Sequence, residues 1–133
     1  MAAYAEDAVD YAKKLKRNLD YSEASIEEIE KICTLLYSAV PRTFFKKLFR
    51  KAPSDETILQ MSKMLGGYLG EVIIKHYGGS WDIEDFMNGG NTIVLNTGGI
   101  KAFPIGKVYK RLTNGPEDNV AHFYQFLTED LKK

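Results

Sequence analysis

The sequence predicts a single α+β domain over residues 1–133, and three observations support this fold class. Apolar residues recur at helical spacing through the first half of the chain and again after Pro104. Between these regions the apolar period shortens to two, and glycine pairs separate short β-branched runs. An order of helices, then strands, then helices is typical of α+β domains, whereas a parallel nucleotide-binding sheet needs alternating strands and helices.

Two amphipathic helices are predicted before Pro41. Residues 5–19 place alanine, valine and leucine on one narrow stripe, so this helix should pack closely on its neighbours. A second stripe starts at Ile26, and Ser25 and Glu28 have the spacing of a capping box at its N-terminus. Pro41 ends the second helix, because proline cannot donate a backbone hydrogen bond and disfavours helix in the preceding residue.

A short basic segment and a long helix follow. Residues 42–51 (RTFFKKLFRK) interleave basic residues with phenylalanines, which predicts a short amphipathic helix with Thr43 at its N-cap. Ser54 is a suitable N-cap for the next helix. That helix carries a wide apolar face over residues 58–73, and Gly78-Gly79 ends it in the left-handed conformation that glycine adopts most easily.

Three short strands are predicted to form an antiparallel meander. The first alternates apolar and acidic side chains, as a half-buried strand does, and the second is rich in β-branched residues. The pairs Gly89-Gly90 and Gly98-Gly99 mark the turns. The predicted strands cover residues 81–84, 92–95 and 100–103.

Two helices are predicted after the strands. Pro104 can start the first of them, because the first helical position needs no backbone N–H. This helix should end at Asn114-Gly115. The last helix is predicted to open at Pro116 and to turn its apolar residues inward over residues 120–131.

Charge and cysteine content limit the classes of function. Eighteen basic residues balance eighteen acidic ones, so the whole chain has no electrostatic reason to bind nucleic acid or an anionic membrane, and we expect neither. The lone cysteine, Cys33, excludes an internal disulfide. The N-terminal residues lack the apolar region of a signal peptide, and no apolar run is long enough to span a bilayer. We therefore expect a cytoplasmic protein.

Few residues suggest chemistry. His76 and His122 have no neighbouring ligands at metal-binding spacing, so we expect no metal and no cofactor. Cys33 lies on an apolar stripe and is expected to be a small buried residue, with a thiolate–histidine pair as the alternative. Glu71 is the only acid between Glu56 and Asp82. It has the spacing of an i,i+4 ion pair with Lys75, and the functional alternative is a buried general base.

Gly66 and Gly70 lie inside the long helix rather than in a loop that follows a strand, so they do not form a phosphate-binding loop. They are four residues apart and share one helix face. Each glycine costs about 1 kcal/mol relative to alanine in a helix interior, and close approach by another segment would offset that cost. We expect both to be packing sites that face the first or second helix.

Trp81 and two charged segments are candidates for contact with a partner. Trp81 is expected in the core, where it would pack on the sheet, with an exposed binding anchor as the alternative. The acidic segment surrounds the first strand, and the basic segment is the short helix described above. Their charged residues are Asp82, Glu84 and Asp85 in the first, and Lys46, Lys47 and Arg50 in the second.

The chain resembles an uncharacterised family of small bacterial domains, known as a domain of unknown function. The blocks that carry the resemblance are residues 68–81, the short strand that ends at Pro104, and residues 107–124. The resemblance covers residues 55–130 and leaves the helical part at residues 1–51 outside it. The recurring positions are Gly70, Glu71, Gly78, Gly79, Trp81, Pro104, Lys110, Arg111, Asn114 and Gly115.

The resemblance implies no catalytic residues, and small bacterial domains of this kind are often immunity proteins. The first hypothesis is therefore a non-catalytic protein-binding module, immunity- or antitoxin-like, that neutralises a bacterial toxin by occluding it. The acidic segment is the favoured surface, since toxins that act on nucleic acids have cationic sites. The alternative is a small enzyme or ligand-binding domain with a pocket near Glu71, His76 and Arg111. Glu71 and Arg111 are expected to form a structural ion pair.

Overall fold

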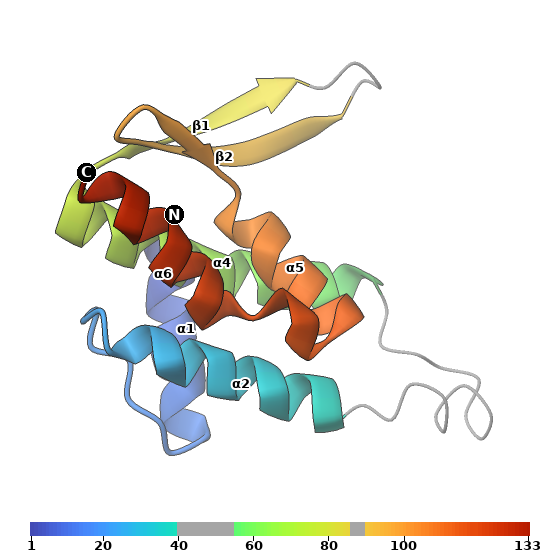
Figure 1. Ribbon diagram of the computed structural model, residues 1–133. Coiled ribbons are helices and arrows are strands. Elements are labelled where there is room, and N and C mark those ends of the chain that lie inside the picture. Colours follow the sequence, from blue (N-terminus) through green and yellow to red (C-terminus); the bar gives the residue numbers. More distant parts are fainter. Residues whose placement is uncertain (40–54, 86–89) are drawn as a thin grey trace.

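The computed structural model describes residues 1–39, 55–85 and 90–133 (Figure 1). The predicted basic helix at residues 42–51 and the predicted caps Thr43 and Ser54 lie outside these ranges, together with Lys46, Lys47 and Arg50. The order of elements confirms the α+β class. In the described part these elements are α1 (Ala2–Lys14), α2 (Ser25–Ala39), α4 (Asp55–Tyr77), β1 (Ser80–Asp85), β2 (Asn91–Thr97), β3 (Ile100–Ala102), α5 (Pro104–Asn114), η1 (Pro116–Asp118) and α6 (Val120–Leu131).

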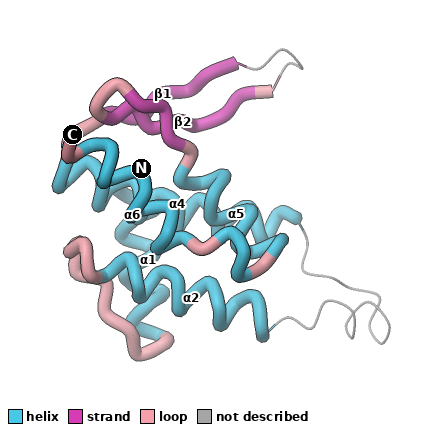
Figure 2. The backbone as a smooth tube through the Cα atoms, in the orientation of Figure 1, coloured by secondary structure: helices cyan, strands magenta, loops and turns pink. Residues whose placement is uncertain are grey.

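Helix α4 lies at the centre of the fold. Its most extensive helix contacts are with α5 and α1, while α2 packs against α5 and α6. The sheet lies to one side of the helices and contacts α4 and α5 through β2, and the Trp81 ring of β1 also reaches α4 (Figure 2). The main apolar core forms between α4 and the helices around it, and its fully buried members include Leu65, Leu69 and Val72 of α4. Within the described ranges, no helix is long and apolar enough to cross a bilayer.

Helix α1 packs closely on α4, as its small side chains predict. Ala5, Ala8 and Ala12 are buried, and a Cβ atom placed on Gly67 of α4 would lie 3.0 Å from the Cβ of Tyr4. The helix ends at Lys14 rather than near residue 19. The backbone N–H of Arg17 donates to the carbonyl oxygen of Ala12, and Lys16 has a φ of 59°. This is a Schellman-type ending, formed here without the usual glycine.

The cap of α2 differs from the predicted capping box. The Ser22 hydroxyl accepts from the N–H of Ser25 at 3.2 Å, so Ser22 and not Ser25 caps the helix. The Ser25 hydroxyl donates to the carbonyl oxygen of Ser22 and lies 2.6 Å from the hydroxyl of Tyr68 on α4. Glu28 pairs instead with Arg17 at 2.7 Å. A long-range bond to α4 has thus replaced the local pattern.

The sheet is the predicted antiparallel meander, with strand order β1-β2-β3. Gly98 and Gly99 form the two-residue loop between β2 and β3 with φ values of 55° and 79°, which is the sign that a type I′ turn requires at both positions. The prediction that β1 is half-buried holds at Trp81, which packs against the core, but is wrong at Ile83, which is 65% exposed. The far end of the β1–β2 hairpin extends away from the helices (Figure 1), which leaves this part of the strand uncovered.

The close approach predicted at Gly66 and Gly70 is confirmed, but the predicted neighbours are wrong. A Cβ atom on Gly66 would lie 2.5 Å from the Cα of Ile105 in α5, and one on Gly70 would clash with the Trp81 ring. The glycine that faces α1 is Gly67. These contacts bring α5 and the first strand against α4.

The ion pair predicted between Glu71 and Arg111 is wrong, because Arg111 pairs with Glu30 of α2. Arg111 is 1% exposed, and its Nε and Nη2 atoms lie 2.9 and 2.8 Å from Oε2 of Glu30. Nη2 also donates to the Thr34 hydroxyl at 2.8 Å. The other Glu30 oxygen accepts from the backbone N–H of Val120 at 2.8 Å. One carboxylate therefore joins α2, α5 and the first residue of α6.

The C-terminal helices begin nearly where the sequence predicts. Pro104 occupies the first turn of α5, as expected. The last helix starts at Val120 rather than at Pro116, because residues 116–118 form a separate 3₁₀ turn. Asn119 is the N-cap, and its side chain accepts from the N–H of His122 at 3.0 Å.

Substituting the glycine between α4 and α5 should destabilise the protein. Gly66→Ala is expected to lower the free energy of unfolding by about 1–3 kcal/mol, because the new methyl group would collide with backbone atoms of Ile105. Gly106→Ala in α5 is the matched control. Its Cβ would lie 3.6 Å from the nearest atom, so helix propensity should make it neutral or stabilising by up to about 1 kcal/mol. Urea unfolding measures both; an equally stable Gly66→Ala variant would contradict the packing role.

Removing the buried carboxylate should be far more costly than removing a partly exposed one on the same helix. Glu30→Ala is expected to cost about 3–5 kcal/mol, since it leaves the Arg111 charge buried without its counter-ion. Glu28→Ala removes a pair whose side chains are partly exposed and should cost less than about 1 kcal/mol. The double variant Glu30→Met with Arg111→Met should recover most of the loss. Equal costs at Glu30 and Glu28 would rule out a dominant role for the buried pair.

Candidate functional site

Three residues expected near a pocket are not brought together. Helix α5 runs antiparallel to α4. Ile105, near the start of α5, lies against Gly66, whereas Tyr109, further along α5, lines a groove with Glu56 near the start of α4. Arg111 therefore lies about 16 Å along the helix axes from Glu71. His76 is exposed near the C-terminal end of α4, where its Nε2 atom lies 3.0 Å from the carbonyl oxygen of Tyr21.

The cysteine has no reactive setting. Cys33 is fully buried in the core, which confirms the expectation of a small buried residue. Burial raises the pKa of the Cys33 thiol to about 12, and the Glu30 carboxylate adds to this effect. The thiolate needed for a thiolate–histidine pair is therefore not populated near neutral pH. Among the described residues, no group of histidine, cysteine, aspartate and glutamate side chains could hold a metal ion.

The three acidic residues of β1 lie on two different faces of the sheet. The Trp81 ring packs over Gly70, so Trp81 faces the helices, and strand alternation places Ile83 and Asp85 on that same face. Asp82 and Glu84 consequently face outward. Asp82 and Asp85 are exposed. The predicted acidic surface is thus an acidic strand with carboxylates on both sides.

Glu84 also has a role within the sheet. Its Oε1 atom lies 2.6 Å from Nζ of Lys101, so this ion pair joins β1 to β3 across β2. The register places Val94 of β2 between these two positions on the outer face. Val94 is buried although it lies outside the main core cluster. The aliphatic part of Lys101 can cover it, as long basic side chains often cover apolar surface.

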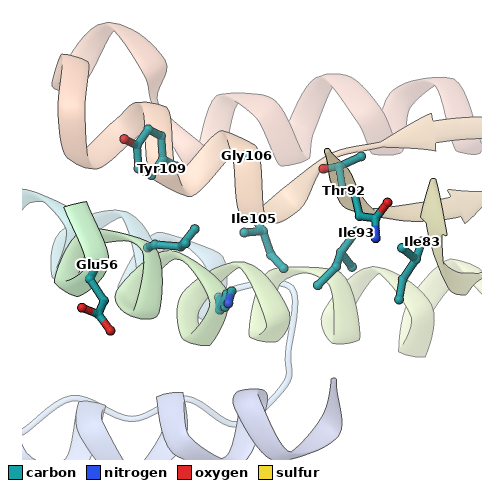
Figure 3. A pocket seen from close by; sticks show the side chains of 10 residues that line it. Glu56, Ile83, Thr92, Ile93, Ile105, Gly106 and Tyr109 are labelled. Atoms are coloured by element: carbon teal, nitrogen blue, oxygen red, sulfur yellow. The ribbon is translucent and has the colours of Figure 1, made fainter. Parts of the chain in front are cut away.

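A groove of about 750 Å³ opens beside β1, between α4, α5 and the β1–β2 hairpin. The side chains of Ile83, Ile93 and Ile105 point toward α4 in this groove (Figure 3). Ile83 is 65% exposed and Leu59 of α4 is 40% exposed, so an apolar wall remains open to solvent. Its charged lining residues are Glu56 and Lys63. We call this groove, together with the exposed residues of β1, the β1 surface.

A second groove, of about 840 Å³, lies between β3, α5 and α6. Phe126 is 73% exposed at its wall, and Phe103 is also exposed. Basic and acidic side chains are mixed around it, and Lys101, Lys107 and Lys133 already pair with carboxylates. Its lining has four lysines, three of them already paired, and two acidic residues, in contrast to the acidic β1.

Comparison with protein-family models, curated proteins and solved structures finds no match to this chain. The site must therefore be judged from its own geometry. The sequence analysis named the acidic residues of β1 as a candidate surface, but it did not single out Ile83 or Leu59. Their only sequence signal was apolar character within periodic patterns, which also describes core residues.

The buried cysteine gives a test of the core that needs no partner. In the native protein at mildly alkaline pH, Cys33 should react with a disulfide reagent only as fast as the chain unfolds, since its raised pKa and burial remove the thiolate. Adding denaturant should make the reaction rapid. Absorbance of the released thiolate follows both conditions. Rapid labelling of the native chain would show that the site is open.

Proposed function

We propose that this chain is a non-catalytic protein-binding module, immunity- or antitoxin-like, which neutralises a toxin by covering it with the β1 surface. The observation that carries the binding role is Ile83, which is 65% exposed on an edge strand beside an open apolar groove. An exposed large apolar residue beside apolar surface is typical of protein contact sites. The toxin class of the partner rests on the sequence resemblance alone.

The surroundings of Ile83 fit a protein contact. Apolar surface next to charged residues is the usual anatomy of an interface: Ile83 faces the groove that Leu59 also lines, while Asp82 and Glu84 lie on the outer face of the same edge strand. Asp82 and Asp85 are the exposed acids of this surface, while Glu84 is held by Lys101. Exposed carboxylates of one sign accelerate the association of a cationic partner.

The volume of the groove favours one alternative. About 750 Å³ with a mainly apolar lining is also the size of a site for a small molecule, so a ligand-binding domain is the second candidate. A small apolar dye that binds in one-to-one ratio, and that still binds after the acidic residues of β1 are changed, would favour it. In that case, no protein from the host should compete with the dye.

Charge reversal at the two exposed acids should slow binding to the cognate partner. The variant Asp82→Lys with Asp85→Lys leaves Glu84 and its pair with Lys101 intact, so the sheet should survive. Capture from an extract of the host supplies the partner, and association rates are then measured at two ionic strengths. The rate should fall several-fold at low salt and by much less at high salt.

The control variant is Asp7→Lys with Asp10→Lys, which changes the net charge equally at exposed positions of α1. It should leave the association rate nearly unchanged at high salt and slow it less than the β1 variant at low salt. For the immunity role, the captured protein expressed alone should arrest growth, and the parent chain should restore it. Equal association rates for the two variants would contradict binding through the β1 surface. A captured partner that never arrests growth would contradict the immunity role.

A further inference from the structure

The direction of each backbone group in β1 follows from the turn between β2 and β3. Residues that flank a two-residue hairpin loop exchange both of their backbone hydrogen bonds, so Thr97 and Ile100 form such a pair. Hydrogen-bonding direction alternates along a strand, so the even-numbered residues of β2, such as Val94, point their N–H and C=O groups toward β1. Through the register, residues 80, 82 and 84 of β1 bond to β2.

The remaining groups of β1 point away from the sheet. The N–H and C=O groups of Trp81, Ile83 and Asp85 lie along its free edge, because β1 is at one end of the strand order and no strand in the described part of the chain pairs with it there. A side-chain contact agrees with this direction. The Ile83 N–H donates to Oδ1 of Asp82 at 2.8 Å, whereas an N–H within the β1–β2 ladder would donate to β2. The free edge therefore has a regular row of donors and acceptors.

The two edges of the sheet differ. The other edge strand, β3, has only three residues and is followed within two residues by Pro104, which has no N–H to offer. β1 has six residues and includes neither proline nor glycine. An edge of this length can accept an added strand unless its side chains prevent pairing.

The charges of β1 select against a second copy of this chain. If two β1 strands paired antiparallel about Ile83, Asp82 of each would lie directly opposite Glu84 of the other. Like charges directly opposite each other destabilise a strand pair. A strand with lysine or arginine at those positions would instead gain a favourable pair with Asp82 and would share Glu84 with Lys101.

We propose that β1 binds an extended segment of its protein partner as an added strand, with a basic–apolar–basic alternation. The basic residues would lie opposite Asp82 and Glu84 on the outer face. The apolar residue would lie beside Ile83 and over the groove that Leu59 and Ile93 line. This inference rests on the proposed function for the surface, and it specifies how the partner is held, through backbone hydrogen bonds at the free edge.

Asp82 makes the edge selective for a basic strand. In the free chain its carboxylate accepts a hydrogen bond from the Ile83 N–H. A neutral or acidic strand that binds this N–H must break that bond and offers the carboxylate no new partner. A basic side chain opposite Asp82 offers the carboxylate a new partner and releases the N–H to the incoming strand. Selection of the partner and opening of the edge then depend on the same carboxylate.

Amide hydrogen exchange with a model peptide tests the inference directly. The probe is a capped peptide of alternating lysine and valine, and the controls are alternating glutamate and valine, and the lysine peptide with all backbone amides N-methylated. The lysine peptide should slow exchange at Trp81, Ile83 and Asp85, while Asp82 and Glu84, already in the ladder, change little. Neither control peptide should do so. Failure of the lysine peptide to bind, or binding without slowed exchange at these three amides, would overturn strand addition.

A substitution in the chain gives an independent test. Ile83→Pro removes the isoleucine side chain and an N–H that points away from the sheet and donates to Asp82, so the ladder to β2 should remain, and Ile83→Ala is the control for the lost side chain. Ile83→Pro should bind the lysine peptide and the captured partner roughly tenfold more weakly than Ile83→Ala. Equal binding by these two variants would overturn strand addition, yet the proposed function would stand if the lysine variants at Asp82 and Asp85 still slowed association. If those lysine variants also had no effect, the proposal that the β1 surface binds the partner would be contradicted as well.

Discussion

The ion pair between Glu30 and Arg111 joins segments that are far apart in the chain. One carboxylate holds the guanidinium of α5 and the first backbone N–H of α6, and both lie against α2. Because the pair is buried, losing either partner is costly, since the other then remains in the core as an uncompensated charge. The Nη1 atom of Arg111 is buried with no hydrogen-bond partner among the described residues, so the charge depends still more on Glu30. This contact therefore joins α2, α5 and α6.

The glycines of α4 provide the second constraint. Gly66 allows the start of α5 to approach, and Gly70 leaves room for the Trp81 ring at the base of β1. The near end of the sheet is therefore fixed to the helices, while its far end extends away from them (Figure 1). This arrangement explains how one strand can be core at Trp81 and exposed at Ile83. It also leaves the free edge accessible over the part of β1 that carries the carboxylates.

Periodicity and turn chemistry in the sequence predicted the fold class, the three-stranded meander and the helix that starts at Pro104. These features depend on residues that are close together in the chain. Contacts between distant residues were less accessible: Arg111 could have paired with any of several acids, and its bond to Glu30 spans 81 positions. The capping box at Ser25 was wrong because the Ser25 side chain binds Tyr68 of α4. Likewise, alternation in β1 predicted which residues share a face, but not that the inner face would be left open at Ile83.

The contact between Trp81 and Gly70 has a practical consequence. Trp81 is the only tryptophan of the chain, so its fluorescence is a signal from one place: the base of β1. The indole Nε1 atom is buried and has no hydrogen-bond partner within the described residues, so small displacements of the ring should change the polarity that it senses. The chain thus contains its own optical reporter two residues from Ile83, and occupancy of the strand edge can be read without attaching a label.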